Sequence, residues 1–147
     1  MSVEKPAQTG FSTIKVRVMT IHNITKIPER IRRGKLFSVE CPSRVILKHV
    51  TGRWGVLVLV ALMGGTQRIS DLLRKVEGVS SKMLAQTLQS LEDDGFVDRV
   101  YFPIVPRHME YSLTPMGLEI GHKVESLADW IETNLPHVLK TQQQLQG

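Results

Sequence analysis

The spacing of apolar and polar residues predicts five helices and one β-hairpin in the chain after about residue 37. Apolar residues at helical spacing indicate a first helix from Ser43 to Gly52. The next segment, Trp54–Met63, is almost continuously apolar, which suits either a buried strand or a buried helix. Its length, and the Gly64-Gly65 pair that follows it, favour the helix.

Two further helices are expected on either side of a short turn at residues 77–79. Ser70 is placed to cap the first, over about residues 71–76, because a hydroxyl can accept the free N–H groups of a first helical turn. Ser80 is placed to cap the second, which runs to about residue 94 and ends at Gly95. One side of this second helix is an apolar stripe of Leu84, Leu88 and Leu91. The other side is small and polar: Ser81, Lys82, Ala85, Gln86, Gln89 and Asp93.

A hairpin and a long helix are expected in the last third of the chain. Phe96–Phe102 and Met109–Leu113 are strand-like runs, and the proline-containing loop between them is typical of a hairpin with a rigid tip. Thr114 followed by Pro115 is a helix start, and the helix should run to about residue 134. Pro136 is expected to end it, leaving a frayed, glutamine-rich tail. One face of this helix carries an apolar row: Ile120, Val124, Leu127 and Ile131.

This order of elements is that of a winged helix-turn-helix, so the expected fold is mainly α with a small β-hairpin wing (α+β). In such folds the second helix of the pair, here residues 80–94, enters the DNA major groove, which is about 12 Å wide. The helix face that reads DNA needs small hydrogen-bonding residues and few negative charges. The predicted DNA contacts are Arg68, Ser80, Ser81, Lys82, Gln86, Gln89, Arg107 and His108.

These contacts have different expected roles. Gln86 is suited to pair with adenine through two hydrogen bonds, and the N–H groups at Ser80 and Ser81 favour a phosphate. Arg107 and His108, at the expected wing tip, are placed to reach a phosphate or the minor groove. The alternative for the helix residues is an ordinary solvated face, and for the wing residues an ordinary exposed turn.

Five motifs stand in order along the chain. They are Cys41-Pro42; Val50-Thr51-Gly52-Arg53-Trp54; Gly78-Val79-Ser80-Ser81-Lys82-Met83-Leu84; Leu88 with Leu91-Glu92-Asp93-Asp94-Gly95-Phe96-Val97 and Arg99; and Val105-Pro106 with Glu110-Tyr111-Ser112-Leu113-Thr114-Pro115 and Gly117. Over residues 37–135 the chain therefore resembles the HxlR family of bacterial transcriptional regulators, which have a MarR-like architecture. The resemblance implies a winged helix-turn-helix that binds operator DNA as a homodimer, with its first and last helices as flanking dimerisation helices.

Two positions depart from the family's pattern. The wing usually carries two adjacent prolines, and Arg107 replaces the second; the position before Trp54 is usually lysine and is Arg53 here. The resemblance, together with the apolar rows, gives these expected dimer contacts: Val45, Ile120, Val124, Leu127 and Ile131. The alternative for the row on the last helix is packing within its own chain.

Composition is that of one folded domain with a separate basic start. The chain has 147 residues, of which 41% are hydrophobic and 22% charged, enough apolar material for a core. Its net charge of +5 is matched by residues 1–40 alone, which hold eight Lys or Arg against three Asp or Glu. The rest is neutral overall, so DNA binding has to depend on local placement. We expect a basic, flexible extension at 1–36, a domain at 37–135 and a polar tail at 136–147. The extension is interpreted as an unstructured addition, with a phosphate-following arm as the alternative.

Cysteine usage and hydropathy indicate a reducing, cytoplasmic location. Cys41 is the only cysteine, so an intrachain disulfide is excluded. The longest apolar run, Val56–Met63, has eight residues, far short of the roughly 20 of a membrane span. The first 30 residues lack an apolar signal core. Cys41 precedes a helix N-terminus, which favours a reactive thiolate, and the resemblance implies a redox sensor at this position in some members. The favoured alternative is a small buried apolar residue.

No enzyme or metal motif is present. The five histidines show no metal-ligand spacing, and the sequence lacks a phosphate-binding loop, a nucleophile elbow and an H-E-x-x-H motif. We therefore expect no catalysis, metal or cofactor. The predicted function is a sequence-specific DNA-binding transcriptional regulator, a homodimeric repressor, whose partners are operator DNA, a second copy and a small-molecule or oxidant effector. The alternative is a winged-helix protein–protein interaction module without DNA binding.

Overall fold

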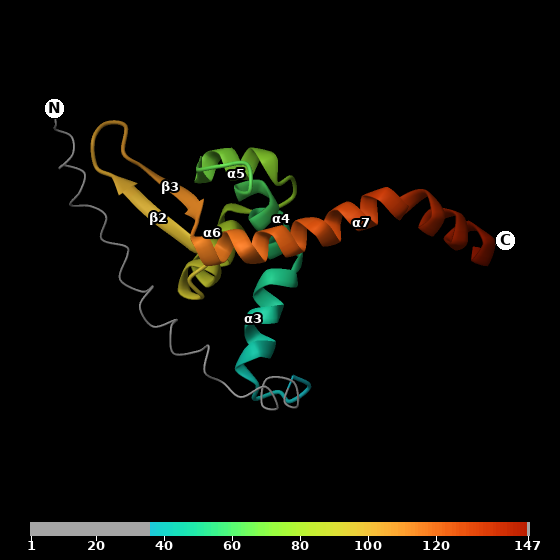
Figure 1. The fold of residues 1–147 in the computed structure, drawn as a ribbon. Helices are drawn as coiled ribbons and strands as arrows, with labels where there is room; N and C mark the ends of the chain where they lie inside the picture. Colours follow the sequence, from blue (N-terminus) through green and yellow to red (C-terminus); the bar gives the residue numbers. More distant parts are fainter. Residues whose placement is uncertain (1–35, 147) are drawn as a thin grey trace.

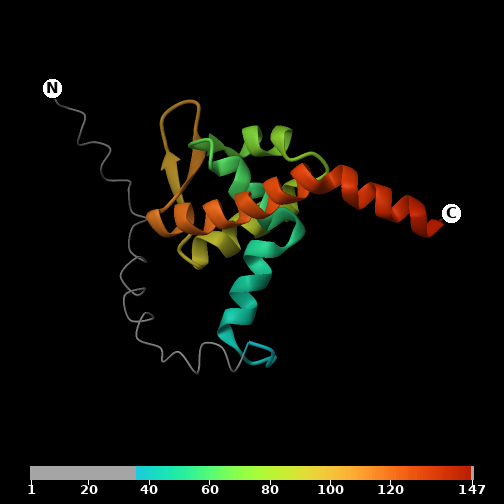
Figure 2. The ribbon, with the colours of Figure 1, turned by 45° about the vertical axis from the view of Figure 1, so that its right-hand side comes forward.

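The computed structural model describes residues 36–146, so nearly all of the expected basic extension lies outside the described residues. Three helices form a body beside a hairpin, and two further helices extend from that body in different directions (Figure 1), as the second view also shows (Figure 2). The expected fold class, mainly α with a small antiparallel sheet, is confirmed. The elements are α3 (Pro42–Thr51), α4 (Arg53–Leu62), β1 (Gln67–Arg68), α5 (Ile69–Lys75), α6 (Ser81–Asp93), β2 (Val97–Phe102), β3 (His108–Leu113) and α7 (Pro115–Gln146).

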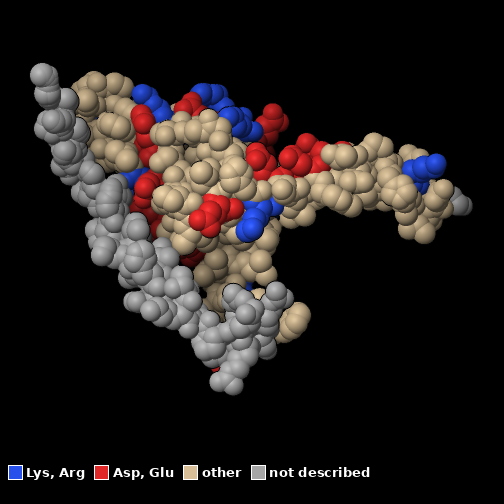
Figure 3. All heavy atoms as spheres, in the orientation of Figure 1, with Lys and Arg blue, Asp and Glu red and all other residues tan. Residues whose placement is uncertain are grey.

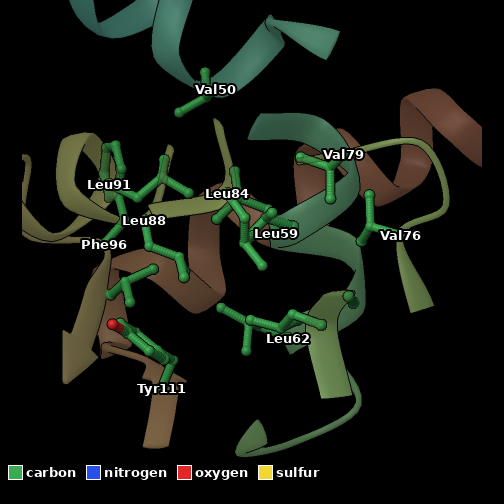
Figure 4. Close-up of a cluster of buried hydrophobic side chains, with 14 of the residues drawn as sticks. Val50, Leu59, Leu62, Val76, Val79, Leu84, Leu88, Leu91, Phe96 and Tyr111 are labelled. Atoms are coloured by element: carbon green, nitrogen blue, oxygen red, sulfur yellow. The ribbon is translucent and has the colours of Figure 1, made fainter. Parts of the chain in front are cut away.

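The core lies between α4, α6 and the sheet. Leu59 of α4 and Leu84 of α6 are fully buried and point toward each other, and Tyr111 of β3 lies at the sheet side of the same cluster (Figure 4). Val50 of α3 packs on the cluster from the opposite side (Figure 4). Each fully buried leucine stabilises the fold by about 1.5–3 kcal/mol relative to an exposed one. The continuous apolar segment is therefore the buried helix that the sequence predicted, α4.

Helix α5 begins earlier than expected, and its cap is a different residue. The N-cap is Arg68, and the Asp71 carboxylate accepts the backbone N–H of Arg68 at 3.2 Å. Ser70 lies inside the first turn, so the prediction that Ser70 caps this helix is wrong. A carboxylate at the third helical position reaches back to the N–H of the N-cap residue, whereas a serine cap accepts an N–H from within the first turn, and the negative charge of the carboxylate suits the helix dipole.

The sheet contains a strand that the sequence pattern did not indicate. Its order is β1-β3-β2, and both pairings are antiparallel. In β1, Gln67 pairs with Tyr111 and Arg68 with Glu110. The Gln67 side chain donates to the Ala61 carbonyl oxygen of α4 at 2.6 Å. The wing is thus attached to the end of α4 as well as to α6.

The junction between the hairpin and α7 follows the predicted cap. Thr114 is 6% exposed, its hydroxyl donates to the Gly95 carbonyl at 2.6 Å, and it accepts the Gly117 N–H at 2.9 Å. Gly95 has a φ of 88°, the left-handed conformation that ends helices and favours glycine. Thr114 therefore caps α7 and ties its start to the end of α6.

Pro136 does not end the last helix. Helix α7 runs from Pro115 to Gln146 with Pro136 inside it, so the expected end near residue 134 is wrong. The segment predicted as a frayed tail is helical as far as residue 146. Proline removes one backbone donor within a helix, yet the helix continues beyond it. Every residue from 135 to 146 is exposed, so this part of α7 projects beyond the body.

Helices α3 and α4 meet at a bend at Gly52. Among the described residues, no single helix combines the length and apolar composition of a membrane span; α3 and α4 together do, but they are bent by 67°. Half of α4 is buried in the core: Gly55, Val58, Leu59, Ala61 and Leu62. Gly55 allows close packing, since an added Cβ there would lie 1.9 Å from the His49 carbonyl oxygen.

Candidate nucleic-acid interface

Helix α6 buries one face and exposes the other. Leu84, Leu88 and Leu91 are at most 1% exposed, as the apolar stripe predicted. The Ser80 hydroxyl accepts the Met83 N–H at 3.0 Å, which confirms the predicted cap. The residues expected to read DNA are exposed on the outer side: Ser80, Ser81, Lys82, Gln86 and Gln89.

The exposed α6 residues differ in what their polar groups contact. Gln89 donates from its side-chain nitrogen to Asp93 Oδ1 at 2.9 Å, so its amide is engaged by a carboxylate one turn later. Ser80 uses its oxygen as an acceptor in the cap, and a hydroxyl can still donate its own proton to a phosphate. The N-terminal half of α6, with Lys82 and Gln86, therefore offers the more favourable surface for an anionic partner.

Arg68 lies where α5 and the wing meet. It is exposed, caps α5 and stands opposite Glu110 in the sheet. The hydrogen bond from the Arg68 backbone N–H, together with the Arg74 guanidinium 2.6 Å from Asp71 Oδ1, lowers the pKa of Asp71 below its ordinary value. Asp71 thus stays negative beside two arginines and reduces the positive field at this end of α5.

The two wing residues expected to contact DNA are placed differently. Arg107 is exposed at the tip. The His108 ring stacks on Phe102 at 4.9 Å, its Nδ1 is 2.9 Å from the Pro106 carbonyl, and its Nε2 is 3.0 Å from Glu110 Oε2. Because both ring nitrogens contact wing oxygens, His108 orders the wing, and Arg107 remains the exposed cation there.

One ion pair and one histidine–carboxylate contact, both missed by sequence reasoning, connect α6 to its neighbours. Glu92, 6% exposed, lies 3.3 Å from Arg99 of β2. The His49 ring of α3 contacts Asp94, just after α6, at 2.7 Å. Glu92 follows the apolar stripe of α6 directly, so a carboxylate on a buried face was the available signal. The His49 contact spans 45 positions and left no local signal.

The expected dimer contacts divide into exposed and buried residues. Val45 on α3 is 51% exposed, and Leu127 and Ile131 on α7 are 50% and 47% exposed. Ile120 is half-buried, and Val124, at 4% exposed, lies in the core of its own chain. Val124 is therefore corrected from an interchain contact to a core residue, because this part of α7 packs on the body.

Cys41 lies at the N-cap of α3, as the sequence indicated, and is 7% exposed. Its side chain makes no capping hydrogen bond to the helix. Burial limits access to a thiol, so this placement favours the interpretation of Cys41 as a small apolar residue. In the described part of the chain, His, Cys, Asp and Glu side chains form no group of three that could hold a metal ion.

Charge is unevenly distributed over the surface. Lys and Arg gather over α5, whereas Asp and Glu follow the middle of α7, on the face seen in Figure 3. The acidic stretch of α7 is an unfavourable surface for nucleic acid. An exposed polar helix beside a hairpin wing, on a three-helix body, defines the class of winged helix-turn-helix regulators.

Comparisons with known proteins agree with that class. A family model described as HxlR-like helix-turn-helix matches residues 49–139. An HTH-type transcriptional regulator of Escherichia coli K12, YtfH, is 61% identical over 113 residues, covering 77% of this chain and 90% of its own. The structure of a YtfH regulator from Salmonella typhimurium aligns with a TM-score of 0.71 at 64% identity, covering 74% of this chain and 96% of its own.

The redox regulator HypR, in its reduced form, aligns with a TM-score of 0.61 at 30% identity, over 69% of this chain and 99% of its own. The chain belongs to the HxlR-like helix-turn-helix family. This is a family of transcriptional regulators rather than a class of enzymes, and the sequence-based assignment to it is confirmed.

Proposed function

We propose that this chain binds operator DNA in the bacterial cytoplasm as a homodimer and represses transcription by covering a promoter. The exposed polar face of α6, held in place by its buried leucine stripe, carries this proposal. Lys82 binds a phosphate, Gln86 reads a base edge in the major groove, and Arg107 contacts the DNA flank from the wing. Ser80 and Ser81 present the helix N-terminus to the backbone.

Two copies pair through apolar surface on α3 and α7. On α3, Ile46 and Leu47 are 38% and 47% exposed beside Val45; on α7, Trp130 is 60% exposed beside Leu127. Monomers rarely expose so many large apolar side chains on two adjoining helices. A twofold dimer covers both surfaces and sets two α6 helices about 34–36 Å apart, one turn of DNA.

The DNA interface is tested by fluorescence anisotropy on fragments from upstream of the protein's own gene, across a salt series. Lys82→Ala should weaken binding on all sequences and reduce the salt slope by about one. Gln86→Ala should reduce discrimination at one base pair by about 1–3 kcal/mol. Lys140→Ala, at the far end of α7, removes the same charge and should leave binding unchanged.

Two results would contradict this interface. Parent-like binding by both folded α6 variants would remove α6 as the recognition helix. Lack of salt-sensitive binding to any genomic fragment would favour the alternative, an interaction module that does not bind DNA.

The dimer is tested by sedimentation velocity. Leu127→Glu places a charge in the proposed interface and should give monomers with weakened operator binding, while Asp129→Asn should remain dimeric. A monomeric parent protein at micromolar concentration, or a Leu127→Glu variant that stays dimeric, would contradict pairing through α7. Repression itself is tested by transcription in vitro, where added protein should lower the yield from a promoter containing the bound fragment.

A further inference from the structure

A cavity of about 290 Å³ lies between the α3–α4 bend and α6. The bend supplies Lys48, His49, Arg53 and Trp54 to its wall, and α6 supplies Met83 and Gln86. Gly52 and Gly55 also line it. Ligand pockets for drug-sized molecules begin at about 300 Å³, so this space suits a single-ring compound.

The wall is positively charged. Lys48 and Arg53 bring two cations, and none of the residues lining the cavity is an aspartate or glutamate. His49 also lines the cavity, and its Nδ1 contacts Asp94, which is not part of the wall. A wall with two cations and no carboxylate therefore favours an anion over a cation.

The same wall has an apolar, aromatic part. The Arg53 guanidinium carbon lies over the Trp54 ring, 4.8 Å from its centre, so the cation rests on the face of an indole. Met83, 41% exposed, faces the cavity from α6. A thioether and an indole favour contact with a flat ring, and a guanidinium favours a carboxylate through paired hydrogen bonds.

The α6 wall connects this cavity with the proposed recognition face. Gln86 lines the cavity and is also exposed beside Lys82 on the outer side of α6. We propose that the cavity binds a small aromatic carboxylate, and that the bound ligand engages Gln86 and weakens operator binding. The second half of this inference rests on the proposed function. Because coupling between two binding sites is reciprocal, bound DNA should weaken ligand binding by the same factor by which bound ligand weakens DNA binding. We expect a factor of about ten.

Benzoate is the probe, and tryptophan fluorescence is the signal. The full chain with Trp130→Phe keeps Trp54 as its one tryptophan, in the cavity wall. Benzoate should change the fluorescence saturably, with a Kd of about 1 mM or lower. Benzamide, which has the same shape without the charge, should bind at least about tenfold more weakly.

A matched pair of variants tests the site. Met83→Glu places a carboxylate in the wall and should abolish benzoate binding, whereas Met83→Gln, of similar size and uncharged, should retain it. Arg53→Gln should weaken benzoate binding at least about tenfold, whereas Lys140→Gln should leave benzoate binding unchanged. In the anisotropy assay, saturating benzoate should weaken operator binding by the parent and leave the Met83→Glu variant unaffected.

Each of the opposite results would overturn one defined part of the proposal. No saturable response to benzoate, or equal affinity for benzoate and benzamide, would overturn the anionic ligand site. If benzoate does not bind and the Arg53→Gln substitution lowers the salt slope of DNA binding, the cavity holds a DNA phosphate instead. Benzoate binding with unchanged operator affinity would overturn the coupling through Gln86. Failure of the unliganded protein to bind DNA would overturn the proposed function, and the fluorescence titration would still decide the ligand site.

Discussion

Replacing Thr114 by valine should destabilise the protein strongly, although valine has nearly the same shape. The Thr114 hydroxyl caps α7 by accepting the Gly117 N–H and also donates to the Gly95 carbonyl, in a site that is 6% exposed. Loss of a cap costs about 1 kcal/mol. A buried polar group deprived of its partner costs about 1–3 kcal/mol more. The free energy of unfolding should therefore fall by about 3 kcal/mol, and the Tm by about 6–12 °C.

Urea denaturation followed by circular dichroism measures this loss, at one fixed protein concentration because dimerisation would add to stability. Thr114→Ser keeps the hydroxyl and removes one methyl group, so it should cost only about 1 kcal/mol. A valine variant within about 0.5 kcal/mol of the parent would refute this reasoning. A serine variant as unstable as the valine variant would show that the methyl group, rather than the hydroxyl, holds the junction.

Three further outcomes are expected. Gly117→Ala should lower the free energy of unfolding, measured by urea denaturation, by about 2 kcal/mol, because the added Cβ would lie 1.9 Å from the Phe96 carbonyl oxygen. Gly64→Ala has room for its Cβ and should change the free energy of unfolding little. Equal losses in the two variants would contradict the close contact at Gly117. Burial raises the pKa of Tyr111 above its ordinary value, so the neutral phenol stabilises the folded state below about pH 10 and this contribution should be lost as the pH rises further. In urea titrations at high pH, the free energy of unfolding of Tyr111→Phe should therefore fall less with pH than that of the parent. Cys41 should react with a thiol reagent about a hundredfold more slowly in the native protein than in urea, and similar rates in both would mean that the thiol is accessible.

Sequence reasoning succeeded where the signal and its cause lie within a few residues. Ser80 and the stripe of Leu84, Leu88 and Leu91 lie within one helix, so the cap, the buried face and the exposed face of α6 were all predicted. Thr114 before a proline gave the start of α7 for the same reason. The exposed candidates on α6 followed from these local features.

The remaining features depend on partners far along the chain. Strand β1 has two residues, too few for a visible alternation, and exists because β3 pairs with it. Val124 and Leu127 belong to one apolar row, and only the position of the body along α7 decides that the first is buried and the second exposed. The cavity beside α6 also depends on a contact between distant segments, since the α3–α4 bend brings Lys48 and Arg53 next to Met83.

The short strand β1 also determines where the chain can change length. Gln67 holds the end of α4 through its side chain, Arg68 starts α5, and both pair with β3. A shift of one residue in this strand would turn each side chain to the opposite face and break all three attachments. The preceding glycines, by contrast, form an exposed turn: an added Cβ at Gly64 would make only ordinary contact, and nothing lies near one at Gly65, although the φ of 123° at Gly65 favours glycine itself. Insertions among related chains should therefore be tolerated at residues 64–66 and excluded one position later.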